Sequence, residues 1–432
     1  MGRRPGSARG ARGRDEVSLE LAVGSLADTG EGSALGPDAT RWLVPGALAG
    51  ETVRAVPEGA RRARLLAVLV PSEARVEPAC PVARVCGGCD LMHLALPEQQ
   101  AFHARRLAEL CGRTLGRAAV PEPRVLAPGA ALGYRSRARL HVRADARGVV
   151  LGYRAPRSHA LVPVRACAVL EPALEPAFAE LAALLAGARG TGEVALARGA
   201  GGARVYDLRW QGELAPASYG RLDAAVRAGE LAGARVWLGG AREPLSFGDA
   251  RPRMPGPDGR ELVLAAGAFA QPSDAGALAL AATVRALAAR VAPGRPALEL
   301  FAGSGTLTVA LAPETGPLEA VESEPASLAC LRDNLRARGL AVRARQADAN
   351  AFAVSREVEL VVLEPPRAGA PGAVEHIAAS RARHVVYVSC APMTLARDAA
   401  RLAAAGFALR ELVSVELFPQ TEHAEAIAWL AR

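Results

Sequence analysis

Two patterns of hydrophobic and polar positions divide the chain near residue 270. Before that point, short aliphatic runs such as VSLELAV and ARLLAVLV alternate with turns rich in Gly and Pro, which is typical of small β-rich modules. From about Asp274 onward, strand-like runs such as PALELFA, VELVVLE and HVVYVS alternate with helical patterns, so we expect an α/β protein with a mostly parallel, doubly wound sheet. The helices are expected at residues 274–290, from Thr306, at 325–338, near 374 and at 392–405.

The β-rich half divides further. Residues 1–14 are rich in Arg, Gly and Ala and have little to bury, so we expect a disordered basic tail. The runs between Val17 and Val70 predict a small barrel. A helix is expected from Pro97 to about Gly112, with Pro in its first turn. Residues from Gly133 to Phe269 are expected to form mainly strands and hairpins, with one helix near 174–187.

Composition narrows the class of protein. All 52 basic residues are Arg, and the formal net charge of +8 suggests an anionic partner such as nucleic acid. No stretch approaches the roughly 18 apolar residues of a membrane span, and the Arg-rich start is followed by no apolar signal core, so we expect a cytoplasmic protein that does not enter a membrane. Seven cysteines in such a protein indicate metal ligation, a nucleophile or plain burial rather than disulfides.

A glycine-containing turn follows the first strand of the α/β half. In LELFAGSGTLT, residues 298–308, Gly303 and Gly305 let the backbone approach a ligand, and Glu322 at the end of the next strand can accept hydrogen bonds from ribose hydroxyls. A dinucleotide and S-adenosylmethionine both suit such a turn. The dinucleotide fingerprint wants a third Gly where Thr308 stands, which favours S-adenosylmethionine.

Three more motifs are expected at the same sheet edge. In VVLEPPRAG, two prolines stiffen a loop that aims Glu364 into the crevice where open α/β sheets bind ligands. In VYVSCAPMTLARD, Cys390 lies between a strand and the start of a helix, where a lowered thiol pKa would make it a nucleophile. In FPQTEHAEAIAWL, His423 and Glu425 are two apart on an expected strand, so both would face one way, and a carboxylate there could act as a general base.

Cysteine spacing indicates a metal site. Cys80, Cys86 and Cys89 lie within ten residues around two glycines, and Cys167 could complete a set of four thiolates. Spacing alone leaves an iron-sulfur cluster and a structural zinc ion open. The remaining Cys111 and Cys330 fall in helical patterns and are expected in the core.

A basic strand is expected at YRSRARLHVR. It carries basic residues at every second position, which would make one face of the strand basic. These residues are Arg135, Arg137, Arg139, His141 and Arg143. A solvated strand face and a track for RNA phosphates are equally compatible with this pattern.

Taken together, these motifs resemble the RNA uracil-5-methyltransferase family, in the bacterial 23S rRNA branch that has a TRAM domain and a [4Fe-4S] cluster. The resemblance implies a Rossmann-like class I methyltransferase domain behind a TRAM/OB-like barrel and a central domain carrying the cluster. It implies that Cys390 is the nucleophile and Glu425 the base. The implied cluster ligands are Cys80, Cys86, Cys89 and Cys167, and the implied S-adenosylmethionine site contains Gln271, Phe301, Thr306, Glu322, Asp348 and Glu364.

The same resemblance implies domain boundaries. The RNA-binding barrel would span residues 15–72, the central domain 73–96 and 125–268, and the methyltransferase domain 97–124 and 269–432. The implied partner is RNA, ribosomal RNA before tRNA, with the protein expected to act as a monomer. Several positions depart from the usual family residues, namely Glu299 and Glu364 for Asp, Thr306 for Asn, Ser273 for Asn and Met92 for Gln.

These departures from the usual family residues leave alternative functions open. An RNA-binding protein that keeps the cluster but no longer catalyses would explain the lengthened carboxylates, because a misplacement near 1 Å can cost about 100-fold in rate. A methyltransferase for a tRNA uridine, for a protein or for a small molecule is a further alternative. We favour catalysis on uridine C5 by covalent addition of Cys390 to C6, because Cys390, Glu425 and Gln271 are all retained.

Overall fold

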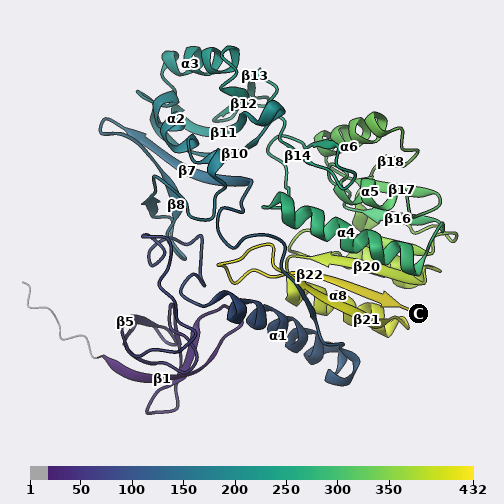
Figure 1. Ribbon diagram of the computed structural model, residues 1–432, viewed down its shortest axis with the longest axis horizontal. Helices are drawn as coiled ribbons and strands as arrows, with labels where there is room; N and C mark the ends of the chain where they lie inside the picture. Colours follow the sequence, from purple (N-terminus) through teal and green to yellow (C-terminus); the bar gives the residue numbers. More distant parts are fainter. Residues whose placement is uncertain (1–17) are drawn as a thin grey trace, which may run out of the picture. The chain divides into compact units, whose positions relative to one another are not determined.

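The computed structural model describes residues 18–432, so the expected tail at 1–14 and Val17 lie outside the described residues (Figure 1). The described chain forms two compact units. One contains the residues up to Glu77 together with His93–Ala95, and the other contains Pro78–Met92 and Leu96–Arg432. None of the helices between residues 18 and 432 is long and apolar enough to cross a membrane.

The N-terminal unit is an antiparallel half-barrel in the order β3-β2-β1-β4-β5, which is the β-rich module that the sequence predicts. Alternate residues of β1, including Leu21 and Val23, are buried against Val44 and Val53. A parallel bridge between Leu43 and Arg62 brings the two ends of the sheet together. The strands are β1 (Leu19–Leu26), β2 (Gly32–Leu35), β3 (Arg41–Val44), β4 (Thr52–Pro57) and β5 (Ala63–Val70).

The larger unit begins with a seven-stranded central sheet in the order β13-β12-β11-β10-β7-β8-β9. Its apolar face packs against α2 (Ala177–Leu184) and α3 (Pro216–Arg227), through residues such as Leu140, Leu181 and Leu222. Helix α3 was not predicted, because its sequence PASYGRLDAAVR has only a short apolar stripe. The strands are β7 (Arg137–Asp145), β8 (Gly148–Arg154), β9 (Leu161–Pro163), β10 (Arg189–Arg198), β11 (Arg204–Glu213), β12 (Leu231–Leu238) and β13 (Leu245–Gly248).

An eight-stranded, mostly parallel sheet follows, in the order β18-β17-β16-β19-β20-β22-β21-β6, as the alternation of strands and helices predicts. Strand β22 is antiparallel to both of its neighbours. The strand β18 was not predicted, because RARQ has no apolar pattern. The strands are β6 (Arg124–Leu126), β16 (Ala297–Leu300), β17 (Leu318–Glu322), β18 (Arg343–Gln346), β19 (Leu360–Leu363), β20 (His384–Ser389), β21 (Ala408–Val415) and β22 (Glu425–Ala431).

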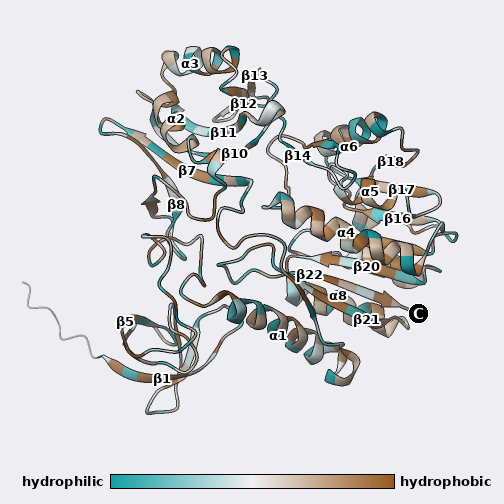
Figure 2. Cartoon of the chain, in the orientation of Figure 1, coloured by the Kyte–Doolittle hydropathy of each residue, from teal (hydrophilic) through white to brown (hydrophobic). Residues whose placement is uncertain are grey.

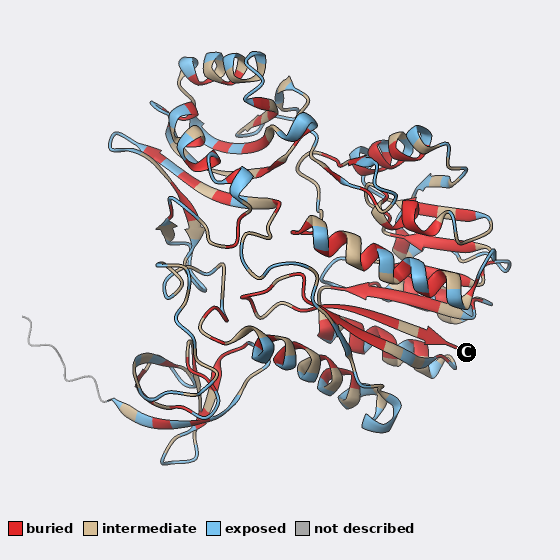
Figure 3. Ribbon diagram, in the orientation of Figure 1, coloured by how far each residue is buried: buried red, intermediate tan, exposed pale blue. Residues whose placement is uncertain are grey.

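Helices cover both faces of this sheet, which is why its central strands are buried and mainly apolar (Figures 2 and 3). Val385 and Tyr387 of β20 belong to the core shared with α1, α7 and α8, whereas Val386 and Val388 belong to the core shared with α4 and α5. The helices are α1 (Leu96–Leu115), α4 (Asp274–Val291), α5 (Thr306–Leu311), α6 (Pro325–Arg338), α7 (Pro371–Ala379) and α8 (Pro392–Ala404).

The segment that contains α1 and β6 precedes the central sheet in the sequence but packs with the parallel sheet. Leu107, Leu110 and the buried Cys111 of α1 share one core with the helix α8, and β6 adds a parallel edge strand beside β21. A short hairpin of β14 (Arg253–Pro255) and β15 (Glu261–Val263) leads from the central sheet back to α4. The chain therefore enters the parallel sheet, leaves it for the central sheet, and returns.

A buried polar contact joins β20 to α8. Tyr387 donates its hydroxyl hydrogen to Asp398 Oδ2 at 2.8 Å, and the fully buried Asp398 also accepts from the Ala370 N–H at 3.0 Å. Replacing Tyr387→Phe removes one donor from a buried carboxylate, so we expect the free energy of unfolding to fall by about 1.5–3 kcal/mol. Urea unfolding measures this loss. Arg227→Ala, which removes an exposed ion pair on α3, serves as the control and should change the value by less than about 0.5 kcal/mol; equal effects of the two substitutions would contradict the prediction.

Candidate active site

Strand topology brings the predicted catalytic residues together. Glu364 directly follows β19 and Cys390 directly follows β20, so both lie at the carboxyl edge of the parallel strands. Strand β22 runs the opposite way and starts at this edge with Glu425. Because Ser389 pairs with Ala426 in the antiparallel ladder, the next position of the register sets Cys390 opposite Glu425.

The alternation of side chains along the strands selects one face of the sheet. Ala297, Val362 and Val388 point into the core beneath α4 and α5. Glu299 and Glu364 lie two residues further along β16 and β19, and Cys390 lies two residues beyond Val388. Three chemically active groups therefore share the face that α4 covers.

Burial raises the pKa values of carboxyl groups at this edge. Glu425 is buried, and neither of its oxygens has a hydrogen-bond partner within residues 18–432. Burial raises the pKa of Glu425 well above its usual value, and the negative charge of Glu364 raises it further. Burial also raises the pKa of Glu364 to about 7, although the Gln271 amide, which donates to Glu364 Oε1, opposes this shift. The pKa of the buried Glu299 rises to about 8.

The thiol of Cys390 does not have the lowered pKa that its place before a helix suggested. Its half-buried position raises the pKa, and the nearby Glu425 raises it further. The exposed guanidinium of Arg367 opposes both effects. The prediction failed because the desolvation of the thiol and the neighbouring carboxylates outweigh the charge of the helix terminus.

The prediction of one strand through His423 and Glu425 was wrong. Strand β22 begins at Glu425, and His423 lies in the turn before it. The imidazole is partly exposed, with Nε2 3.5 Å from Arg367 Nη2 and Nδ1 3.3 Å from the Glu422 carboxylate. His423 therefore contacts the rim of the site, whereas Glu425 lies inside it.

Helix α1 fixes the turn that precedes Glu425. The buried His103 contacts Glu416 through Nδ1 at 2.8 Å, and its Nε2 lies 3.0 Å from the Thr421 carbonyl oxygen. One turn earlier, Gln99 exchanges hydrogen bonds with Gln420, accepting from its backbone N–H at 2.8 Å. Sequence analysis missed these supports, although polar residues four apart on the buried face of α1 were a usable signal.

The glycine turn after β16 is closed by Glu322. Its Oε2 accepts from the Gly303 N–H at 2.8 Å, and its Oε1 accepts from the Glu324 N–H at 2.7 Å. Phe301 adopts a left-handed backbone with φ of 62°, which is rare for a residue with a side chain and marks a turn held by its surroundings. Gly305 has a left-handed backbone with φ of 96°, which side chains rarely adopt, so this position favours glycine.

Two further predicted cofactor residues lie near these strand ends. Thr306 is the first residue of α5 and is partly buried. Asp348 is exposed just beyond β18, and its Oδ1 accepts from the Asn350 N–H at 2.9 Å. The carboxylate of Asp348 therefore keeps lone pairs that face solvent.

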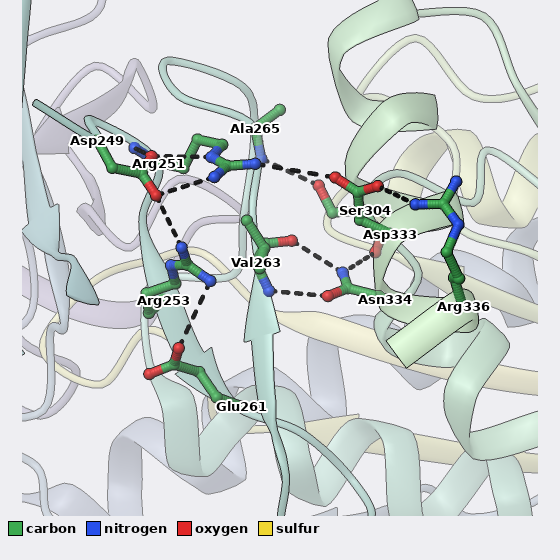
Figure 4. A network of polar contacts seen from close by, with 10 residues as sticks. All are labelled: Asp249, Arg251, Arg253, Glu261, Val263, Ala265, Ser304, Asp333, Asn334 and Arg336. Atoms are coloured by element: carbon green, nitrogen blue, oxygen red, sulfur yellow. Dashed lines mark hydrogen bonds and ion pairs between the residues drawn. The ribbon is translucent and has the colours of Figure 1, made fainter. Parts of the chain in front are cut away.

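A hydrogen-bond network around Asn334 holds the segment that leads to Gln271 against the glycine turn (Figure 4). The Asn334 amide of α6 bonds the backbone N–H and carbonyl of Val263 at 2.9 and 2.8 Å and also donates to the Ser304 carbonyl at 2.8 Å. Ser304 Oγ in turn accepts from the Ala265 N–H at 3.2 Å. The strap 261–271 is thereby held beside the turn, and its last residue reaches Glu364.

The four predicted ligand cysteines line one pocket. Cys80, Cys86, Cys89 and Cys167 lie around it together with Arg135 and Tyr153. Burial raises the pKa of Cys89 to about 12, and the charges of Cys167 and Cys86 add to this rise. Within the described residues, no three His, Cys, Asp or Glu side chains are grouped so as to hold a single metal ion.

The basic residues predicted on one strand face do not form a uniform track for phosphates, because several of them are paired with carboxylates. Arg135 precedes β7 and lines the cysteine pocket, and Arg137 is paired with Asp274 at 2.8 Å and donates to the Gln271 carbonyl. Arg139 and His141 both contact Glu193, at 3.2 Å each. The predicted alternation is confirmed from Arg137 onward, but Arg137 itself is mostly buried in an ion pair and is not available to a phosphate.

Sequence comparison identifies relatives of nearly full length. A family profile described as tRNA (Uracil-5-)-methyltransferase matches residues 343–432, and one described as Methyltransferase small domain matches residues 260–383. The 23S rRNA (uracil(1939)-C(5))-methyltransferase RlmD of Chromohalobacter salexigens is 36% identical over 97% of this chain and 90% of its own length. The protein of the same name from Pseudomonas aeruginosa is 36% identical over 98% of this chain and 96% of its own.

A solved structure has the same fold. The Pyrococcus abyssi tRNA (uracil-54, C5)-methyltransferase, in complex with S-adenosyl-L-homocysteine, superposes with a TM-score of 0.72 at 22% identity and covers 96% of this chain and 100% of its own. This likeness extends over both β-rich parts and the parallel sheet. Since relatives at 36% identity span almost the entire sequence, the chain belongs to the RNA uracil-5-methyltransferase family.

Proposed function

We propose that this protein transfers a methyl group from S-adenosylmethionine to C5 of a uridine in 23S rRNA. The observation that carries the proposal is the pairing of a half-buried thiol, Cys390, with a buried carboxylate, Glu425, at one register position of the sheet edge. The names of the relatives support 23S rRNA as the substrate. That the protein acts as a monomer stays a prediction.

Uracil C5 is a weak carbon nucleophile, which explains the need for both groups. In the proposed mechanism, the Cys390 thiol first releases its proton to solvent, and the thiolate then adds to C6, so that the electron pair of the C5–C6 double bond makes C5 an enolate carbon. After methylation, Glu425 accepts the C5 proton, the double bond re-forms, and the Cys390 thiolate leaves. The raised pKa of Glu425 makes its ionised form a stronger base than an ordinary carboxylate, and it is this form that accepts the proton.

The residues at the strand ends fit S-adenosylmethionine. Each Glu322 oxygen accepts one backbone hydrogen bond and keeps a lone pair for a ribose hydroxyl, and the exposed Asp348 offers a second acceptor. Gln271 Oε1 is buried without a partner, so it too can accept from a ligand. When bound, S-adenosylmethionine supplies the electrophilic methyl group.

Glu364 replaces the shorter Asp that the family resemblance leads one to expect. Its extra methylene carries the carboxylate to the Gln271 amide, and both groups hold each other beside Cys390. We infer that the pocket accommodates the longer side chain through this contact. The proposal therefore keeps Glu364 and Gln271 as ligand-binding residues of a working enzyme.

We also propose that the four cysteines bind a [4Fe-4S] cluster. The four thiols around one pocket support this proposal, because a cluster of this kind would be held by four cysteine thiolates. Arg135 Nε is buried beside the pocket without a partner and can donate to a sulfur of an anionic cluster.

Substitutions of the catalytic pair should stop the reaction at different points. Cys390→Ala removes the nucleophile, so methyl transfer and any protein-RNA adduct should both be lost. Glu425→Gln keeps the nucleophile but removes the base, so a methylated adduct that resists SDS should accumulate while turnover falls by at least about 100-fold. Radiolabelled methyl transfer and gel analysis measure both outcomes. The buried Cys111→Ala is the control, and methyl transfer by Cys390→Ala would contradict the mechanism.

Arg367 should set the pH at which Cys390 becomes reactive. Its positive charge lowers the Cys390 pKa, so Arg367→Ala should shift the pH profile of iodoacetamide labelling to higher pH. Peptide mass spectrometry of Cys390 measures the labelling rate. Arg401→Ala, an exposed change on α8, should leave the profile unchanged, and a downward shift for Arg367→Ala would refute the assignment.

The cluster gives a spectroscopic prediction. Protein purified without oxygen should be brown, with broad visible absorbance that dithionite bleaches. Cys89→Ser should lose this absorbance, while Cys330→Ser, whose thiol lies on α6, should retain it. A colourless protein with one equivalent of zinc would exclude the cluster.

A further inference from the structure

The central sheet has one covered face and one polar face. Residues such as Leu140, Val194 and Leu208 point to α2 and α3, so the alternate residues of the same strands point away from these helices. On the polar side, the ladders place His141 beside Glu193 and Glu193 beside Arg209.

Trp237 lies on this polar face, on β12, which is the strand next to the edge strand β13. It pairs with Arg209 across the β11–β12 ladder, and the Arg209 guanidinium lies 5.3 Å from the centre of its ring. Arg235 lies 5.5 Å from the same ring, and the indole N–H donates to Asp207 at 3.1 Å. Trp237 is partly exposed, so its ring can be reached from outside the sheet.

The charges on this face favour the binding of an anion. Glu193 is already paired with Arg139 and His141, and Asp207 with Arg235. Arg209 is exposed and makes no ion pair within the described part of the chain, so its guanidinium remains available to an anion. A sheet face that carries exposed Arg beside an aromatic ring matches the chemistry of single-stranded RNA, whose bases stack on aromatic or guanidinium planes while its phosphates contact Arg.

A short segment of the chain connects this face to the catalytic pocket. Arg235 donates to the Ala266 carbonyl oxygen at 2.6 Å, and five residues later Gln271 reaches Glu364 beside Cys390. Five residues span at most about 18 Å, which a few nucleotides can cover. The strap between them carries Phe269, which is 75% exposed.

We propose that the open face of the central sheet, centred on Trp237 and Arg209, binds a single-stranded segment of the RNA next to the methylated uridine. One base stacks on the Trp237–Arg209 pair, and the Arg209 charge lies against a phosphate. This inference rests on the proposed function, because it identifies where the rest of the same RNA substrate binds.

Binding of a short oligouridylate tests the inference without requiring methyl transfer. Addition of the oligouridylate to the full-length protein should quench tryptophan fluorescence, and most of that quenching should be absent in Trp237→Phe. By anisotropy of a labelled oligouridylate, Trp237→Ala should weaken binding about 5- to 100-fold, while Trp237→Phe, which keeps a ring for stacking, should stay near the wild type.

Arg209→Ala should also weaken binding and should lower the salt dependence, by about 0.7 in the slope of log affinity against log salt. The matched control is Arg227→Ala, because Arg227 is exposed on α3 of the covered side and should leave affinity and slope unchanged. Thermal unfolding of each variant shows that the sheet remains folded.

The inference is overturned if Trp237→Ala and Arg209→Ala bind oligouridylate with the affinity and salt slope of Arg227→Ala. A failure of the proposed function has a different signature. In that case the wild type transfers no methyl group to 23S rRNA, yet the loss of oligouridylate binding in Trp237→Ala still supports an RNA-binding face on the central sheet.

Discussion

The antiparallel insertion of β22 between β20 and β21 is the constraint on which the site depends. A purely parallel sheet would place only strand ends at its carboxyl edge. Because β22 runs the opposite way, its first residue, Glu425, enters that edge from the buried side and meets Cys390 in register. The same insertion takes Glu425 out of water, and this burial makes it basic.

Placing several carboxylates and a thiol at one edge is unfavourable for folding, and hydrogen bonds from neighbouring groups offset part of this free energy. Glu322 is satisfied by two backbone N–H groups, and Glu364 by the Gln271 amide, whereas Glu425 has no partner within residues 18–432. An unpartnered buried carboxylate is unfavourable for folding and is tolerated where the fold holds it from several sides. Helix α1 supplies that restraint through Gln99 and His103, so a segment some 320 residues away in sequence positions the base.

Periodicity alone predicts most of the fold and the grouping of the catalytic residues. The helix α6 was placed at its observed bounds, and Cys390 and Glu364 were assigned to one edge because the ends of parallel strands meet there. Glu425 was expected at the same edge, but its place there results from the antiparallel direction of β22. The features that periodicity missed depend on burial in three dimensions. The sign of the Cys390 pKa shift, the turn at His423 and the burial of Arg137 are all set by neighbours that are distant in the sequence.

The strap 261–271 connects the two sheets of the larger unit chemically as well as covalently. Asn334 and Ser304 hold its first half against the glycine turn, Arg235 holds its middle, and Glu364 holds its end. These contacts join β12 of the central sheet, the glycine turn and Glu364 through one short segment, so the position of Gln271 depends on anchors in both sheets of the larger unit.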